Sequence, residues 1–395
     1  MTKIMAVNAG SSSLKFQLFE MPEETVITSG IVERIGMDDG IFTIKYNGEK
    51  KTTTCPIPDH QVAVEMLLKA LVDEGVVTEL KEIDAVGHRI VHGGEYFSDS
   101  AVVDDDVVAK VEELCELAPL HNPAHLIGYR AFKAELPNVQ HVFTFDTAFH
   151  QSLDKERYLY PLPLEYYTDL KVRRYGAHGT SHKYVSEQVI DMLGNPTESR
   201  VIVCHLGNGA SISAVLNGKC VDTSMGFTPL DGVPMGTRTG SMDPAVVTYL
   251  INQKGMSAKD VDALMNKESG VSGVSGVSSD FRDLSAAAKE GNDRAQLALD
   301  MFSYQVKKDI GAYAAAMGGV DAVVFTAGVG ENDAATRSAV VEGLDFMGIK
   351  INEEKNAARG TVDISADDAT VKTLVIPTNE ELMIAIDTKR LVENK

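Results

Sequence analysis

The sequence has little of what characterises a disulfide-stabilised or secreted protein. It contains no tryptophan and only four cysteines in 395 residues, and these four show no C-x-x-C spacing. So few thiols without paired spacing indicate reduced side chains rather than a disulfide framework. The N-terminal stretch MTKIMAVNAG has no apolar signal core, so we expect a cytoplasmic protein.

Positive charge is also scarce. The chain has 37 Lys and Arg against 57 Asp and Glu, a formal net charge of -20, and its basic residues are scattered apart from Arg173 and Arg174. No basic stripe follows a nucleic-acid backbone or attracts an anionic membrane, so we expect neither as a partner. A polyphosphate substrate stays open, because a few placed cations and a divalent metal ion neutralise it locally.

Long hydrophobic runs are missing as well. The longest weakly charged window, residues 311–330, is interrupted by Asp321 and by glycines, which predicts a buried helix and a strand rather than a membrane span.

The chain length of 395 residues exceeds the roughly 250 to 300 residues at which single cores stop growing, so we expect two domains.

The usual phosphate-binding motifs are absent, since the chain has neither a Walker A pattern nor a strand-linked G-x-G-x-x-G. Two similar segments take their place, IMAVNAGSSSLKFQLF (4–19) and VIVCHLGNGASISAVL (201–216). An ungapped alignment sets Asn8 opposite His205 and Gly10 opposite Gly207. Each reads as a strand, a turn of small residues and a second strand, and such turns aim N–H groups at an anion. The pair predicts a duplicated architecture that grips phosphate twice.

A third glycine-rich segment is TAGVGEN (326–332), where we expect a strand to break at Gly328 and Gly330 before a helix. The N-terminus of a helix offers N–H donors to phosphate or ribose oxygens.

Strand-like and helical patterns alternate along the chain. Residues 4–45 predict an antiparallel meander with turns at Gly10, Gly30 and Gly40. We expect further strands within 83–94, 139–150 and 373–378, and helices over 61–73, 295–317 and from Asn379. The repetitive GVSGVSGVS (270–278) predicts a flexible surface loop.

Three cations lie in glycine-rich surroundings. Lys15 follows the first turn, where a phosphate contact competes with a purely structural role. Arg89 (in GHRIVHGG) and Arg238 (in PMGTRTGSMDP) can bind carboxylate or phosphoryl oxygens bidentately or form surface salt bridges.

Histidine pairs four residues apart suggest zinc, but the pattern does not support it. No Glu follows the first histidine of 88/92, 121/125 or 178/182, and Pro123 or Gly179 disrupts a helical face. His178, between Gly176 and Gly179, is instead placed to approach a ligand and donate to developing charge.

Three carboxylates stand at predicted element ends. Asp146 ends a strand and could be a general base, a metal-linked carboxylate or a cap. Glu380 and Glu381 begin a helix, where acids pair with the helix dipole or ligate Mg²⁺.

Ten segments in order along nearly the whole chain resemble the acetate kinases. They are NAGSSSLK, GHRIVHGGE, LAPLHNPA, FDTAFH, YGAHGTSH, HLGNGAS, MGTRTGSMDP, SSDFRDL, GVGEN and PTNEEL. The resemblance implies an α/β fold of two duplicated ribonuclease H-like domains, as in actin, Hsp70 and sugar kinases, with ATP in an interdomain cleft. On this basis residues 1–150, completed by a C-terminal helix over 379–395, form one domain and residues 151–378 form the nucleotide-binding domain. The implied reaction is reversible transfer of the ATP γ-phosphoryl group to acetate, giving acetyl phosphate and ADP, with Mg²⁺ (or Mn²⁺), in a homodimer.

Matching motifs imply roles for individual residues. Asn8 and Glu381 hold the metal, Arg89 binds the acetate carboxylate, His178 and Arg238 stabilise the transferring group, and His121 lines the site. Asp146 occupies the family's catalytic acid/base position. The phosphates contact Lys15, Ser11, Ser13, His205, Leu206, Gly207, Asn208 and Gly209. The adenosine contacts Asp280, Phe281, Arg282, Gly328, Val329, Gly330, Glu331 and Asn332. The methyl pocket is formed by Val91, Leu120, Ala177 and Pro229.

Two of these positions need comment. Acetate is already ionised near neutral pH, so we expect Asp146 to orient the arginines or a metal-bound water rather than to abstract a proton. Ala177 stands where the family usually has an aromatic residue, which leaves room for longer acids such as propionate.

Two other functions remain open from the sequence. A sugar kinase of the same superfamily would need an unambiguous base and a hydroxyl-binding pocket, whereas two arginines favour a carboxylate. A non-catalytic ATP-driven protein of the Hsp70 or actin type usually carries a partner-binding extension, and we find no spare domain for one.

Overall fold

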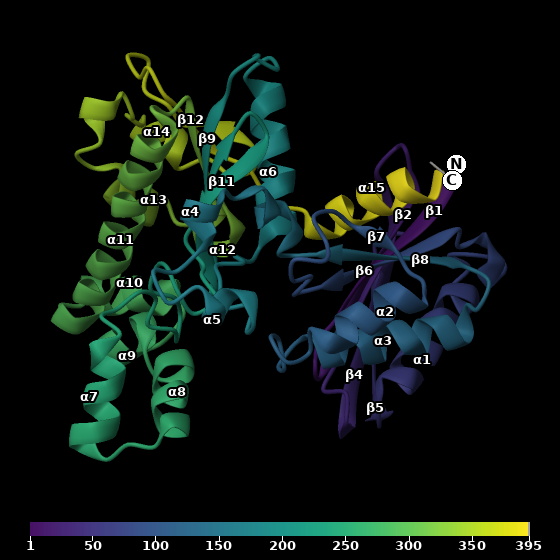
Figure 1. Cartoon of the computed structure of the whole chain (residues 1–395). Coiled ribbons are helices and arrows are strands. Elements are labelled where there is room, and N and C mark those ends of the chain that lie inside the picture. Colours follow the sequence, from purple (N-terminus) through teal and green to yellow (C-terminus); the bar gives the residue numbers. More distant parts are fainter. Residues whose placement is uncertain (394–395) are drawn as a thin grey trace. The chain divides into compact units, whose positions relative to one another are not determined.

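The computed structural model describes residues 1–393 and divides the chain into two compact units (Figure 1). The first unit comprises Met1–Gln151 together with the chain from Asn379 onward, and the second comprises Ser152–Thr378. Each unit contains one mixed β-sheet and several helices, so the chain belongs to the α/β class.

The sheet of the first unit has the strand order β5-β4-β3-β2-β1-β6-β8-β7. Its strands are β1 (Thr2–Ala9), β2 (Ser13–Met21), β3 (Thr25–Glu33), β4 (Met37–Tyr46), β5 (Glu49–Ile57), β6 (Ala85–Ile90), β7 (Ala101–Val102) and β8 (Gln140–Phe145). The first five form an antiparallel meander, β6 pairs in parallel with β1, and β8 pairs in parallel with β6. The predicted meander and the predicted strands within 83–94 and 139–150 are confirmed.

Two of the predicted meander turns are wrong. Gly30 and Gly40 lie inside β3 and β4, while the chain turns at 22–24, 34–36 and 47–48. A Cβ atom on Gly30 would lie 2.4 Å from the carbonyl oxygen of Thr43, and one on Gly40 would lie 2.6 Å from the side chain of Ile57. These glycines therefore allow close packing within the sheet.

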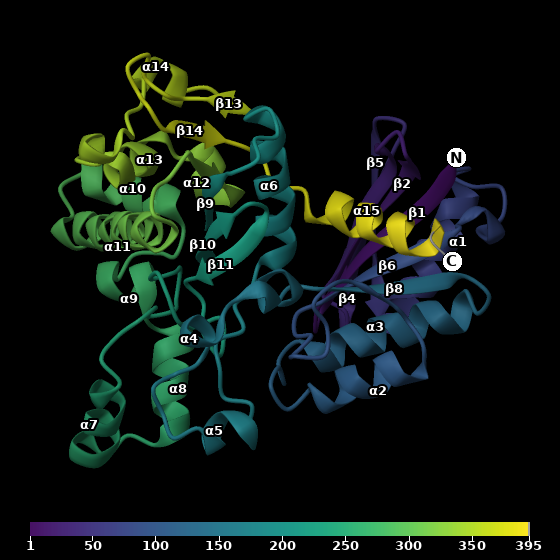
Figure 2. The same cartoon turned by 45° about the horizontal axis from the view of Figure 1, so that its top comes forward.

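Helices cover both faces of this sheet. They are α1 (His60–Asp73), α2 (Asp105–Glu113), α3 (Asn122–Glu135) and α15 (Glu380–Glu393), with short 3-10 turns at Leu80–Glu82 and Ala148–Ser152. α15, yellow in Figures 1 and 2, packs on β6, where a Cβ atom on Gly87 would lie 2.2 Å from Thr388 Oγ1. α3 packs equally closely on β1, since a Cβ atom on Gly128 would lie 2.4 Å from Ala9 Cβ.

The sheet of the second unit has the strand order β11-β10-β9-β12-β14-β13. Its strands are β9 (Arg200–Leu206), β10 (Ala210–Leu216), β11 (Lys219–Thr223), β12 (Ala322–Thr326), β13 (Val362–Asp363) and β14 (Lys372–Val375). The order and directions repeat those of β3-β2-β1-β6-β8-β7, including an antiparallel last strand. The predicted duplication is therefore present, and both units have the ribonuclease H-like strand arrangement.

The helices of the second unit surround its sheet. They are α4 (Lys155–Tyr158), α5 (Glu165–Thr168), α6 (Gly179–Met192), α7 (Ala245–Lys254), α8 (Ala258–Lys267), α9 (Gly270–Ser275), α10 (Phe281–Lys289), α11 (Asp293–Met317), α12 (Ala327–Asn332), α13 (Ala334–Val341) and α14 (Glu353–Asn356), with a 3-10 turn at Asp345–Met347. α11 packs on β9 and β10, while α6 packs on β9 and β12. Phe302, Val306 and Ile310 of α11 are fully buried in the core.

The repetitive GVSGVSGVS segment is not a flexible loop over most of its length. Residues 270–275 form α9, which packs against α11, and the Val271 side chain is 1% exposed. Gly270 has φ +62°, and a Cβ atom there would lie 2.0 Å from the carbonyl oxygen of Met235. Small residues allow this helix to approach the backbone of a neighbouring loop, which composition alone did not reveal.

Asp309, in α11, is a partly buried carboxyl group in the second unit. Burial raises its pKa from the ordinary 3.8 to about 6, opposed by the hydrogen bond from Gln305 and by Lys308, and assisted by Asp231 and Asp222. Because the folded state holds this proton more tightly than the unfolded state, the contribution of Asp309 to stability falls as the pH rises from about 4 to about 6 and is level above that range.

We predict that Asp309→Asn raises the free energy of unfolding by about 2 kcal/mol near pH 8 and changes it little near pH 4. Denaturant unfolding at several pH values measures this. Asp300→Asn is the matched control, because exposed Asp300 also accepts a hydrogen bond from a glutamine four residues earlier on α11. Equal pH profiles for the two variants would contradict the prediction.

Candidate active site

In the first unit, Arg89 and Asp146 meet at the carboxyl ends of neighbouring parallel strands. Arg89 lies in β6, and Asp146 directly follows β8. Arg89 Nε donates to both carboxylate oxygens at 3.1 Å, and Nη2 donates to Oδ2 at 2.6 Å. Burial lowers the pKa of the guanidinium, but attraction to Asp146 and Glu380 outweighs burial and raises that pKa. The arrangement fixes one edge of the guanidinium on Asp146.

The opposite edge of Arg89 is much less engaged. Among residues 1–393, its Nη1 makes a single long contact of 3.4 Å, to Asn8 Oδ1. A guanidinium with one edge anchored and the other edge available suits a carboxylate or phosphoryl ligand. The site can therefore bind a small anion beside Asp146.

Asn8, Lys15 and the first two acids of α15 lie close to this pair. Asn8 and Lys15 are paired across β1 and β2, and Lys15 Nζ forms an ion pair with Glu381. Burial, then Asp146 and Glu381, raise the pKa of Glu380, while Arg89 and Lys15 lower it. A divalent cation would relieve this crowding of carboxylates.

The donors here fit a hard cation. They are carboxylate and amide oxygens, which Mg²⁺ prefers. Within residues 1–393, no three His, Cys, Asp or Glu side chains form a ready-made metal cluster.

The loop that leads into α3 contains two further predicted site residues, Leu120 and His121. His121 immediately precedes α3, and buried Asn122 exchanges hydrogen bonds with the backbone of His92. Of the two predicted pocket residues in this unit, Val91 is buried and Leu120 is 77% exposed.

In the second unit, His178 lies against the second glycine turn. It precedes α6 in a left-handed conformation (φ 59°), and its ring stacks on that of His205 with centroids 4.2 Å apart. Its Nδ1 lies 2.8 Å from Ser211 Oγ. A Cβ atom on Gly209 would lie 3.4 Å from His178 Nε2 and 3.8 Å from Arg238 Nη1. The fold therefore brings the turn, His178 and Arg238 together.

Arg238 is held in an irregular loop. Its Nη1 donates to the carbonyl of Pro229 at 2.9 Å, and burial lowers the pKa of the guanidinium. The loop is tied to the turn, because the Gly236 N–H donates to the carbonyl of Asn208 at 3.0 Å. Ala177, the fourth predicted pocket residue, is buried in the core of this unit.

The segment 326–332 differs from the expectation. The helix α12 already includes Gly328 and Gly330, so the strand ends at Thr326 rather than at a glycine break. The turn instead begins at Ala327, which has φ +64°. Glu331 Oε1 accepts from the N–H groups of Ala327 and Thr378, so its carboxylate fastens the segment internally.

A buried arginine, which the sequence did not single out, holds this segment in place. Arg337 is 1% exposed and donates to the carbonyl of Gly330 at 2.8 Å and to Asn356 Oδ1 at 2.7 Å. The sequence offered one indication of this contact, the position of Arg337 seven residues after Gly330.

The predicted adenosine residues 280–282 begin α10. Asp280 caps the helix by accepting from the Arg282 N–H at 2.8 Å, and its carboxylate also pairs with the Arg282 guanidinium. Phe281 is buried edge-to-face on Phe302, with centroids 4.7 Å apart. Phe281 therefore faces the core, and its flanking residues provide the exposed polar groups.

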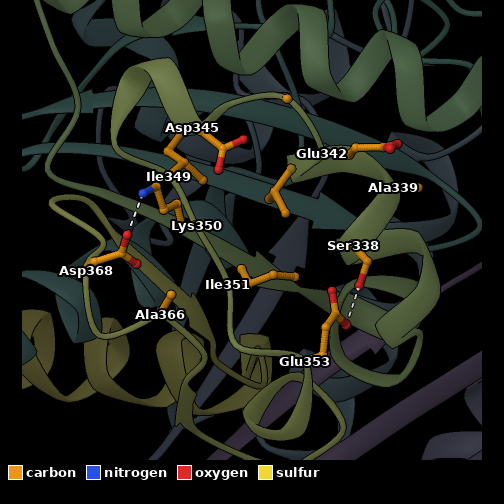
Figure 3. A pocket seen from close by; sticks show the side chains of 12 residues that line it. Ser338, Ala339, Glu342, Asp345, Ile349, Lys350, Ile351, Glu353, Ala366 and Asp368 are labelled. Atoms are coloured by element: carbon orange, nitrogen blue, oxygen red, sulfur yellow. Dashed lines mark hydrogen bonds and ion pairs between the residues drawn. The ribbon is translucent and has the colours of Figure 1, made fainter.

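An open hollow of about 560 Å³ lies elsewhere on the second unit (Figure 3). It is lined by acids and by Lys350, which pairs with Asp368, while Glu353 accepts from Ser338. None of the predicted site residues lines it.

Across the described residues, no helix has the length and hydropathy of a bilayer span.

Known proteins are similar to this chain over nearly its full length. The chain is 58% identical over 393 residues to a protein named acetate kinase from Geobacillus kaustophilus (99% of each chain), and 55% identical over 395 residues to acetate kinase from Bacillus subtilis (100% of each). The crystal structure of Porphyromonas gingivalis acetate kinase matches with a TM-score of 0.95 at 48% identity (99% and 100% of the chains). That of a propionate kinase from Francisella tularensis matches with a TM-score of 0.93 at 40% identity, with the same coverage. The acetokinase family model matches residues 3–386, so the chain belongs to the acetokinase family.

Proposed function

We propose that the protein is an acetate kinase that transfers the γ-phosphoryl group of ATP reversibly to acetate by direct in-line attack, giving acetyl phosphate and ADP. The family membership supports the activity, and one structural observation supports the choice of a carboxylate acceptor. That observation is Arg89, anchored on Asp146 by Nε and Nη2 with its Nη1 edge directed elsewhere.

Arg89 binds and orients the acceptor. Acetate is ionised at neutral pH, so an oxygen lone pair is available for attack without a base. The contribution of this unit is therefore positioning, which can supply much of the rate of a two-substrate reaction. Asp146 acts through Arg89, whose orientation it fixes. The methyl group of acetate packs against Val91, Leu120, Ala177 and Pro229.

His178 and Arg238 stabilise the transferring group. Phosphoryl transfer develops charge on the equatorial oxygens of a loose transition state, and fixed donors lower the barrier most. Both side chains border the turn that carries Gly207, Asn208 and Gly209. His121 lines the acceptor side.

The nucleotide contacts come from several backbone-rich segments. Lys15, Ser11, Ser13 and residues 205–209 hold the phosphates. Residues 280–282 and 328–332 surround the adenosine. Because ATP is a cytoplasmic substrate, we infer the cytoplasm as the compartment in which the protein works.

Asn8 and Glu381 hold the divalent metal ion, for which Mg²⁺ is our first choice and Mn²⁺ the alternative. When bound with ATP, such an ion neutralises phosphate charge. Lys15 then has to exchange its ion pair with Glu381 for a phosphate contact. Glu380 stays beside Glu381 and adds negative potential at the cation.

A homodimer is the assembly we propose. The sequence of α7 is largely apolar, yet none of its residues is buried, and Tyr249 is 51% exposed. Leu162, Leu164 and Leu170, around α5, are each more than half exposed. Apolar surface of this kind is usually covered by a partner. Light scattering should therefore give twice the chain mass, and a monomer at micromolar concentration would argue against the dimer.

An acyl-phosphate assay tests the activity. The purified protein is incubated with ATP, Mg²⁺ and a panel of short carboxylates and sugars, and hydroxylamine traps any acyl phosphate. We expect acetyl hydroxamate and ADP in equal amounts. ADP formed with a sugar and not with acetate would instead identify a sugar kinase. Hydrolysis without any acceptor dependence would identify an ATP-driven binding protein.

We predict that Asp146→Asn lowers kcat about 100-fold at saturating Mg²⁺, because Arg89 loses the charge that fixes its orientation. Steady-state kinetics with acetate varied measures this. If Asp146 positions Arg89, the residual activity keeps the shape of the wild-type pH profile, whereas loss of a general base would remove its acidic limb. The control is Asp99→Asn, which breaks an exposed ion pair with Arg390 in the same unit. A near-normal kcat for Asp146→Asn would exclude both the positioning and the acid/base role.

We predict that Ala177→Phe raises the acetate-to-propionate ratio of kcat/KM about tenfold, because an aromatic ring removes room for the extra methylene. Parallel assays with the two acids measure the ratio. The ratio is its own control, since a general loss of stability lowers both rates together. A ratio that stays the same or falls in the variant would show that Ala177 does not set the size of the acyl pocket.

A further inference from the structure

Two buried histidines hold the turn between β1 and β2. His125 Nδ1, on α3, lies 2.7 Å from the carbonyl oxygen of Ala9, and His60 Nε2, at the start of α1, lies 2.7 Å from that of Gly10. The rings are 4% and 6% exposed. Consecutive carbonyl groups are thus each bonded to an imidazole from a different helix.

The chemistry of these contacts fixes the tautomer of each ring. A carbonyl oxygen carries no proton, so His125 bears a proton on Nδ1 and His60 bears one on Nε2. Burial, then Arg89, lowers the pKa of His125 to about 4, so its ring is neutral near pH 7. Its Nε2 is buried without a hydrogen-bond partner among residues 1–393. His125 therefore acts as a single directed donor toward Ala9.

Holding the carbonyls also aims the amides. In a planar trans peptide, the C=O of one residue points opposite to the N–H of the next. The Gly10 N–H accordingly turns to the carbonyl of Ser13 at 2.8 Å, and the carbonyl of Ser12 accepts from the Ile35 N–H at 3.0 Å. The Ser11 N–H points away from His60 and has no acceptor within the described chain.

The two helices that carry the histidines are themselves fixed. Asp59 caps α1 by accepting from the Val62 N–H at 2.9 Å, and α1 packs against α3. The close approach of Gly128 to Ala9 presses α3 directly on the turn. In the second unit a backbone donor holds the turn one aligned position further along, since the Gly236 N–H bonds the carbonyl of Asn208, which aligns with Ser11.

We propose that His60 and His125 are positioning residues that hold residues 9–12 so that the Ser11 amide meets a phosphate of ATP. The inference rests on the proposed function, because it names what prepares the phosphate site of the first unit. Neither ring touches the nucleotide in this scheme. Each ring acts by holding a carbonyl group of the turn. Without these hydrogen bonds, the glycine backbone of the turn would be free to rotate.

Matched substitutions test the two rings separately. Gln can place its Nε2 near the position of His60 Nε2, and Asn can place its Nδ2 near that of His125 Nδ1, whereas Leu fills the space without donating. We expect His60→Leu and His125→Leu to lower kcat/KM for ATP about tenfold, the cost of one misdirected hydrogen bond. His60→Gln and His125→Asn should recover most of that loss, and the KM for acetate should change less than about twofold in the His60 variants.

The control is His141→Leu, which removes a buried histidine of the same unit that contacts His88 rather than the turn. It should lower the Tm without changing the KM for ATP. Binding of Mg·ADP, measured by calorimetry, should follow the same order of variants. Because this measurement needs no turnover, it tests whether the two histidines hold the turn even if the wild-type protein fails to phosphorylate acetate. Leu variants within twofold of wild type, or Gln and Asn variants no better than Leu, would overturn the proposal.

Discussion

The candidate site residues of the first unit depend on one buried ion pair, between Arg89 and Asp146. Asp146 is 1% exposed, and a carboxylate this deep is tolerable only when a cation and its hydrogen bonds compensate it. The strand register makes the pair unavoidable, because β6 and β8 run in parallel and end at the same edge. Glu380 and Glu381 add negative charge near this guanidinium, and Lys15 forms an ion pair with Glu381. The same fixed edge leaves Arg89 only one direction in which to bind an anion.

The duplicated sheet contains the same kind of turn twice, with different groups holding the carbonyls of each turn. Both turns have three residues between their strands, and both first glycines donate back into the turn. In the first unit imidazoles from α1 and α3 hold the turn carbonyls, and in the second a loop amide from Gly236 does so. The loop that holds the second turn also carries Arg238. In the second unit one loop therefore both holds the turn and carries Arg238, whereas in the first unit the imidazoles that hold the turn lie on helices and Arg89 lies on β6.

The strands and the long helices were predictable from the sequence because apolar periodicity and the duplicated hairpins are local signals. Gly30, Gly40 and the GVS repeat were misread, since a glycine that permits a turn and one that permits close packing look the same until the neighbouring element is known. Site residues in recognisable motifs could be named from the sequence and their roles stay predictions, while His60 and Arg337 were missed. Both side chains contact backbone carbonyl groups, His60 that of Gly10 fifty residues earlier and Arg337 that of Gly330, and a contact to a carbonyl group requires no particular residue type at the acceptor position.

In the second unit, two non-glycine residues with left-handed backbone lie next to predicted site residues. Their positions indicate where the backbone is strained. His178 and Ala327, with φ 59° and 64°, each begin a helix directly beside a predicted phosphate or nucleotide segment. Such backbone is held only when its surroundings over-determine it. Ser211 and the ring of His205 hold His178, and Glu331 holds Ala327 through its N–H. The strain at Ala327 lets a short helix start immediately at the end of β12, so that its first N–H groups lie at the edge of the sheet where the turn of residues 207–209 also lies.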